Sequence, residues 1–213
     1  MSYGVSADSY CSRIRELLDR NEESSLLYAT LELRCAVEAR MKEYLAPLDH
    51  VPRAQKKEYS VVKLGRTVDN VFPLKEQIAL FTICFPDGGE EVTLRYVPVP
   101  KRLQDIAARG GDSLHYPGER NANDPMWWRR LREMIVEGYE WFSYVAAGDL
   151  MGMPLLNRKT KQSNLRIFML DDDPRSLFLK RLALGAEHKI RVGYEPIPRN
   201  PPRASAHVVP SEA

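Results

Sequence analysis

The residues best suited to chemistry in this chain are an arginine and a histidine near the middle of the sequence. Arg109 and His115 fall within residues 98–118, PVPKRLQDIAARGGDSLHYPG, with five residues between them. A histidine titrates near about pH 6.5 and exchanges protons under cellular conditions, whereas an arginine stays charged and forks onto phosphate oxygens. The pair therefore predicts a site that acts on a phosphate ester.

Cleavage of RNA without a metal ion is the reaction that fits this pair. The imidazole of His115 would take the proton of a ribose 2′-hydroxyl or protonate the leaving oxygen, and the guanidinium of Arg109 would stabilise charge on the phosphorus oxygens. One histidine cannot begin as both base and acid, so the reaction requires two copies of the pair in one cleft. An isologous homodimer supplies them, and we expect such a dimer.

A structural role is the competing interpretation of the same residues. In it, His115 is a loop or core histidine and Arg109 pairs with Asp105 or Asp112. Both interpretations place Arg109 on a short helix that Gly110 and Gly111 end. Because glycine frees the backbone, the double glycine would let both side chains turn toward one point.

Three helices carry the apolar periodicity of a packed bundle. They are predicted over residues 7–19, from Ser24 or Ser25 to Leu45, and from Asp124, a capping residue followed by Pro125, to Ala147. The second has an apolar stripe of Leu26, Ala29, Leu33, Val37, Met41 and Tyr44. The third has a seam of Trp128, Leu131, Ile135, Gly138, Phe142 and Val145. We expect the seam to pack on the stripe, or to serve as the dimer surface.

The strand-forming segments are fewer. Residues 77–85 and 90–97 flank Pro-Asp-Gly-Gly and predict a β-hairpin. Residues 165–170 and 189–194 read as strands on either side of a short helix at 175–184, and they could pair with the hairpin or with each other. Residues 51–57 read as a linker. Within the second helix, Arg34 and Glu38 are one turn apart and should form an ion pair.

The predicted fold class is therefore α+β and predominantly helical. It is a helical bundle with a β-hairpin inserted at 77–97 and a small C-terminal strand-helix-strand element, all in one domain over residues 1–195. Residues 196–213 are rich in proline, lack apolar periodicity and predict a disordered tail.

Composition excludes several classes of protein. No apolar run approaches the roughly 18 residues of a membrane span, and the N-terminus lacks the pattern of a secretory signal. The 3 cysteines are scattered and odd in number, which favours a reducing compartment and a cytoplasmic protein. The aspartates at 171–173 lack the ligand spacing of a calcium loop, and no metal or cofactor motif is present, so neither is expected.

Basic residues suggest where a polyanion could bind. Arg129 and Arg130 follow two tryptophans, an arrangement that suits base stacking and phosphate contacts, although aromatic residues at this spacing usually belong to a core. Arg158, Lys159 and Lys161 form a basic loop at the start of a C-terminal segment that is basic overall. We take these five residues as candidate nucleic-acid contacts, against the alternative of a solvated basic surface.

These features together resemble the HEPN superfamily of small helical proteins. The resemblance rests on LYATLELRCAVEARMKEYL at 27–45, on Arg109-x5-His115 before a final long helix, and on the inserted hairpin. It covers residues 7–47 and 100–147. It implies a dimeric, metal-independent endoribonuclease of a toxin–antitoxin or phage-defence system, with Arg109 and His115 as catalytic residues.

Two further functions stay open. One is a protein-interaction or accessory module without catalysis, which would bind an antitoxin or a subunit of a defence complex through its seam helix or hairpin edge. The other is a nucleic-acid binder that uses the basic C-terminal third of the chain.

Overall fold

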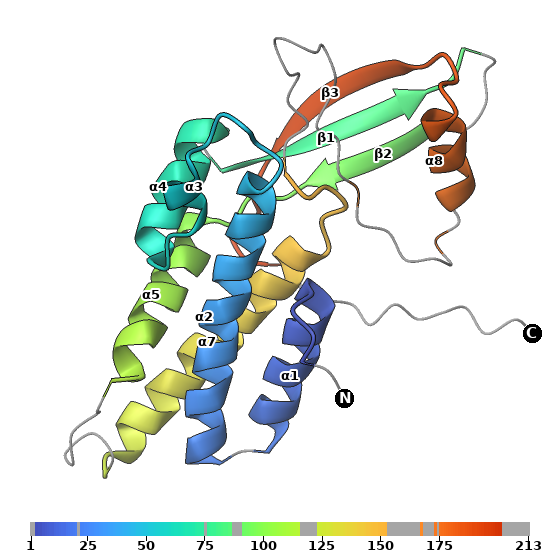
Figure 1. Cartoon of the computed structure of the whole chain (residues 1–213). Helices are drawn as coiled ribbons and strands as arrows, with labels where there is room; N and C mark the ends of the chain where they lie inside the picture. The colour runs from blue at the N-terminus through green and yellow to red at the C-terminus, as the bar shows by residue number, and fades with distance from the viewer. Residues whose placement is uncertain are drawn as a thin grey trace, which may run out of the picture.

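Four helices form the body of the protein, and a small sheet lies at one end of them (Figure 1). They are α1 (Ala7–Asp19), α2 (Glu23–Leu45), α5 (Lys101–Ser113) and α7 (Pro125–Ala146). The computed structural model describes residues 3–20, 22–74, 76–86, 91–115, 123–152, 167, 173 and 175–201. The predicted fold class, α+β and predominantly helical, is confirmed.

Local signals set most of the helix ends. Helix α1 has the predicted bounds, and the Ser9 N–H donates to Oγ of its cap, Ser6. Asp124 caps α7 as expected, accepting from the Met126 N–H at 2.9 Å. The predicted serine cap of α2 is wrong, because α2 begins at Glu23 and Ser25 is buried within its first turn.

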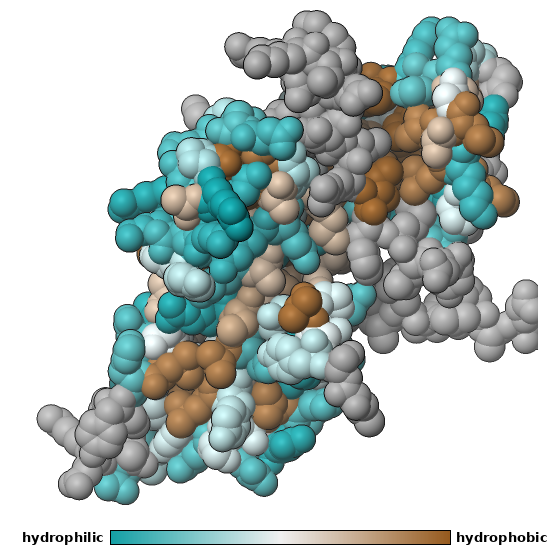
Figure 2. Space-filling model, viewed as in Figure 1, coloured by the Kyte–Doolittle hydropathy of each residue, from teal (hydrophilic) through white to brown (hydrophobic). Residues whose placement is uncertain are grey.

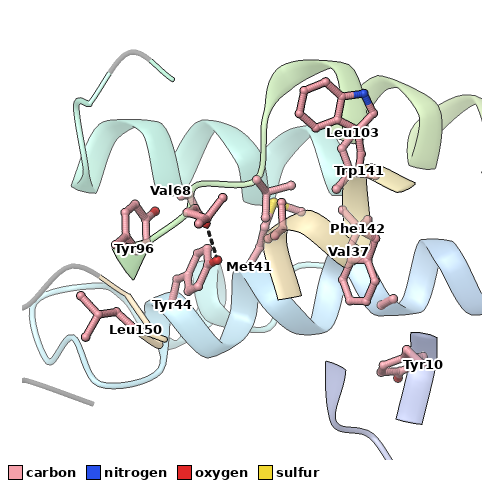
Figure 3. Packing of buried hydrophobic residues seen from close by; sticks show 14 of the residues in the cluster. Tyr10, Val37, Met41, Tyr44, Val68, Tyr96, Leu103, Trp141, Phe142 and Leu150 are labelled. Carbon is pink, nitrogen blue, oxygen red and sulfur yellow. Dashed lines mark hydrogen bonds between the residues drawn. The ribbon is translucent and has the colours of Figure 1, made fainter. Parts of the chain in front are cut away.

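The core lies where the stripe of α2 meets the seam of α7. Every stripe residue is buried, and so are Leu131, Ile135, Gly138, Phe142 and Val145 of the seam, while Trp128 is half-buried. Figure 3 shows part of this packing, with Val37 and Met41 of α2 near Phe142 of α7. The expected packing of seam on stripe is confirmed. The seam is therefore used inside the chain and is not available as a dimer surface.

The segment predicted as a linker contains a short helix and leads into another. Residues Arg53–Lys56 form α3, and Val61–Val71 form α4, whose N-terminus is capped by Ser60 accepting from the Lys63 N–H. Buried Val61, Leu64 and Val68 face the core, at the spacing of one helix face. That spacing is present in the sequence, but no helix was predicted for this segment.

Within the described residues, the sheet has three antiparallel strands in the order β2-β1-β3. Strands β1 (Gln77–Cys84) and β2 (Glu91–Tyr96) form the predicted hairpin, with Phe81 opposite Leu94. Strand β3 (Lys189–Pro196) pairs with the other side of β1, which settles the partner that the sequence left open. Of the predicted strand at 165–170, only Ile167 lies within the described residues, in a bridge with Leu150.

The short helix α8 (Ser176–Ala183) precedes β3, close to its predicted bounds. Its buried Phe178 packs against Phe85, the residue after β1, with the ring centroids 4.6 Å apart and the rings tilted by 47°. This contact holds α8 near the tip of the sheet, away from the helical bundle (Figure 1).

A buried arginine joins the bundle to the sheet. Arg40 of α2 is 1% exposed, and its Nη2 donates to the carbonyls of Val145 and Gly148 at the C-terminal end of α7. Its Nε donates to the Tyr44 hydroxyl, which donates to the Val97 carbonyl after β2. The guanidinium thus gives the Val145 carbonyl a second partner besides the Gly148 N–H, and it binds the Gly148 carbonyl just beyond the helix.

None of the described helices is both long and apolar enough to cross a lipid bilayer.

Candidate functional site at one end of the bundle

Arg109 and His115 both lie on the surface at the C-terminal end of α5. Arg109 is exposed, and its Nε donates to the Asp105 carbonyl oxygen at 3.3 Å. His115 follows the helix, is exposed, and its backbone N–H donates to the Asp112 carbonyl at 3.4 Å. The imidazole is therefore open to solvent. The alternative carboxylate pairing of Arg109 is not what the structure shows, since Arg109 contacts a backbone oxygen and Asp105 pairs with Lys101.

The double glycine does not end the helix, which corrects the prediction from sequence. Helix α5 continues through Gly110 and Gly111 to Ser113, and both glycines are buried. A Cβ on Gly110 would lie 2.9 Å from Cγ2 of Thr30, and one on Gly111 would overlap the guanidinium of Arg34. At Gly110, α5 lies too close to α2 for a side chain, whereas at Gly111 the end of the flexible Arg34 side chain could move aside.

Continuity of the helix changes how the two candidate residues lie relative to each other. Arg109 lies within the helix, whereas His115 lies two residues past Ser113, the last helical residue, so helix periodicity does not fix the angle between the two side chains. No hydrogen bond joins their side chains in the described part of the chain. Both side chains are exposed, and no helix break at Gly110 and Gly111 turns them toward one point.

Helix α2 contributes a further ion pair beside this segment. Arg34 lies against Gly111, and its Nε donates to Glu38 Oε1 at 3.2 Å, as the sequence predicted. Glu38 also pairs with Lys42 at 3.6 Å. The position of Arg34, beside the glycine that comes two residues after Arg109, could not be foreseen because it depends on how α2 and α5 pack.

The structure brings two of the candidate nucleic-acid contacts to the same end. Because α5 and α7 are antiparallel neighbours, the C-terminal end of one lies beside the N-terminal end of the other (Figure 1). Arg129 and Arg130 in the first turns of α7 are exposed, and Arg130 lies 3.6 Å from its partner Asp124. Arg158, Lys159 and Lys161 lie outside the described residues. We call the surface of Arg109, His115, Arg129 and Arg130 the bundle end.

The tryptophans of α7 belong partly to the core. Trp127 and Trp128 are half-buried and pack edge to face, with their centroids 4.6 Å apart. Arg132, on the next turn, donates two hydrogen bonds to the Leu18 carbonyl at the end of α1. Glu137 of α7 binds Arg102 of α5. The exposed cations of α7 are thus confined to its first turns.

A cleft lies at the opposite end of α5. Its volume is about 990 Å³, and it is lined by the start of α5, the middle of α7 and residues 196–201. Glu76, in the left-handed region at φ 62°, caps α5 by accepting from the Lys101 N–H at 2.6 Å. With 13 residues in α5, roughly 18 Å of helix separate this cleft from the bundle end. The cleft and the Arg109–His115 pair therefore lie at different sites on the molecule.

Within the described residues, no group of three or more histidine, cysteine, aspartate or glutamate side chains is arranged to hold a metal ion. The chain matches no protein-family model, no curated protein and no solved structure. Any functional conclusion therefore depends on the geometry of the chain itself.

Proposed function

We propose that this protein is a HEPN-like protein of the cytoplasm that acts on RNA at the bundle end, as a metal-independent endoribonuclease of a toxin–antitoxin or phage-defence system. One observation supports this: an exposed imidazole and an exposed guanidinium lie at the same end of a four-helix bundle as the exposed cations of α7. Arg129 and Arg130 would contact phosphates, and Arg109 and His115 would act at the scissile bond.

The reaction needs only proton transfer and charge stabilisation. His115 takes the proton of the ribose 2′-hydroxyl as the 2′-oxygen attacks phosphorus, and the 5′-oxygen leaves with a proton donated by His115 of a second copy. The products are a 2′,3′-cyclic phosphate and a 5′-hydroxyl. The guanidinium of Arg109 stabilises the charge that develops on the phosphorus oxygens.

The test is RNA cleavage by the purified protein in EDTA. His115→Ala and Arg109→Ala should each lower the rate by about 100-fold or more, the usual contribution of a positioned proton donor or acceptor. Both side chains are exposed, so both variants should melt at the temperature of the parent protein.

His188→Ala is the matched control. His188 follows Arg181 at a similar spacing and is exposed, but it lies beside the sheet, with its Nδ1 2.9 Å from the Ala186 carbonyl. Cleavage should be unchanged in this variant. Full activity of His115→Ala, or activity that EDTA abolishes, would exclude the proposed mechanism.

A second candidate function is the non-catalytic interaction module. The observation that favours it is strand β3, whose residues are all exposed and include Ile190, Val192 and Tyr194. In this role the chain would bind a protein partner through the sheet, and purified protein would leave RNA intact in EDTA and in Mg²⁺ alike.

A further inference from the structure

The two edge strands of the sheet, β2 and β3, differ in their contacts with the rest of the chain. Along β2, the Leu150 N–H donates to the Arg95 carbonyl, and the Arg95 N–H donates to a carboxylate oxygen of Asp149. The chain after α7 therefore pairs with that edge at Arg95, near the end of β2. Along β3, every residue is exposed, and the backbone groups that do not face β1 point outward.

The side chains of β3 are apolar on one face. Ile190, Val192 and Tyr194 are 50%, 46% and 53% exposed. They lie opposite Ile83, Phe81 and Ala79 of β1, which are buried, so the apolar face of the sheet continues past the part that is covered. Figure 2 shows hydrophobic surface over the sheet and α8, at the upper right. Such a patch beside an open edge is typical of an interaction surface.

The sequence of β3, KIRVGYEP, is complementary to itself when two copies run antiparallel. A twofold axis at Val192 places each Val192 opposite its equivalent and Ile190 opposite Tyr194 of the other copy. The same register places Lys189 opposite Glu195 at both ends. Opposite charges and apolar pairs facing each other across strands stabilise a sheet.

Neither charged residue is already committed within the described part of the chain. Lys189 and Glu195 are exposed and take part in no ion pair there, whereas the neighbouring Arg191 binds Glu91 of β2 at 2.6 Å. A twofold axis one residue earlier would set Arg191 against Arg191, a repulsive pair. The register centred on Val192 matches both charge and hydrophobicity.

We infer that β3 pairs with β3 of a second copy of this chain, forming a continuous six-stranded antiparallel sheet. The contact is isologous, as a twofold dimer requires. It extends the apolar face from one subunit into the other and satisfies the outward backbone groups of both edges.

This association is independent of the proposed action on RNA. The sheet lies at the opposite end of the helices from Arg109 and His115 (Figure 1), so pairing through β3 neither covers the bundle end nor brings two such ends together. The second His115 of the proposed reaction would come from a separate contact between two bundle ends. A substitution in β3 therefore changes the mass in solution and leaves RNA cleavage unchanged, while His115→Ala does the reverse.

Charge reversal at the ends of the strand tests the register. Lys189→Glu alone and Glu195→Lys alone each set like charges against each other at both ends of the paired strands. Each should raise the dissociation constant of the dimer about tenfold, measured by sedimentation equilibrium, because two attractive pairs become repulsive. The double variant K189E/E195K restores both pairs and should associate as tightly as the parent.

Mixing the two single variants is the sharpest control. The Lys189→Glu chain carries negative charge at both ends of β3, and the Glu195→Lys chain carries positive charge at both ends. In a 1:1 mixture, opposite charges would therefore face each other at both ends, and the mixture should recover a dimer of twice the 24.4 kDa chain. The inference is overturned if the parent protein sediments as a monomer at tens of micromolar, if the single variants associate as tightly as the parent, or if mixing fails to recover the dimer.

Discussion

Two tyrosines in the core differ in whether their hydroxyl groups have a partner. Tyr44 and Tyr96 are both fully buried, with their ring centroids 5.0 Å apart. The Tyr44 hydroxyl accepts from Arg40 and donates to the Val97 carbonyl at 2.7 Å. The Tyr96 hydroxyl is buried without a hydrogen-bond partner among the described residues. An unpaired buried hydroxyl lowers stability, because it has lost its hydrogen bonds to water.

This contrast predicts opposite effects for the same substitution. Tyr96→Phe should raise the free energy of unfolding by about 1 kcal/mol, while Tyr44→Phe should lower it by about 1 to 3 kcal/mol because Arg40 and a carbonyl lose a partner. Urea unfolding followed by circular dichroism measures both. A Tyr96→Phe variant less stable than its parent would mean that the Tyr96 hydroxyl has a partner after all.

At the scale of elements, glycine residues allow neighbouring helices to pack more closely than a side chain would permit. A Cβ at Gly138 of α7 would overlap Cδ2 of Leu33 on α2 and lie 2.8 Å from Cγ2 of Ile106 on α5. Gly138 therefore sits where three helices meet. Gly110 of α5 allows a similarly close approach to Thr30 of α2, and the glycine pair that looks like a helix break in the sequence lies inside a helix.

Gly138→Ala should destabilise the protein by about 1 to 3 kcal/mol, the usual effect of overpacking a core, although alanine favours a helix. Thermal and urea unfolding of the variant measure this effect. Val136→Ala, on the partly exposed side of the same helix, is the control and should change stability by about 0.5 kcal/mol or less. If Gly138→Ala were as stable as its parent, α7 would have room to move away from α2 and α5.

At the scale of the whole molecule, buried tyrosines make the stability of the protein depend on pH in the alkaline range. Burial raises the pKa of Tyr10 from 10.0 to about 12, and burial also raises the pKa values of Tyr44 and Tyr96. In the unfolded chain these groups lose their protons near pH 10, whereas in the folded chain they keep them to higher pH. Between these values the folded state binds more protons, so stability falls as pH rises.

We therefore expect the free energy of unfolding that these groups contribute to be intact at about pH 9 and to decline from about pH 10 upward. Urea unfolding at about pH 9 and about pH 11, with tyrosinate absorbance recorded in parallel, measures the decline. Tyr10→Phe should weaken the pH dependence, and Tyr59→Phe, at a position 74% exposed, should not. An equal effect of the two substitutions would contradict the assignment to burial.

The sequence predicted those parts of the fold that depend on local periodicity. The bounds of α1, the apolar stripe of α2, the seam of α7 and the hairpin all follow from spacing that one element presents by itself. For the candidate site, it identified residue types suited to acid, base and phosphate chemistry. It could not show that α5 continues through Gly110 and Gly111, because a helix break and a close helix contact favour the same residue.

Only the tertiary structure decided which elements meet. It brought Arg129 and Arg130 to the end that holds Arg109 and His115, buried Arg40 against the end of α7, and paired β3 with β1 rather than with another strand. These outcomes depend on contacts between residues far apart in the chain, and such contacts leave no pattern in any single segment. Local spacing predicts which segments form helices and strands. The packing of these elements against one another decides which residues share a surface.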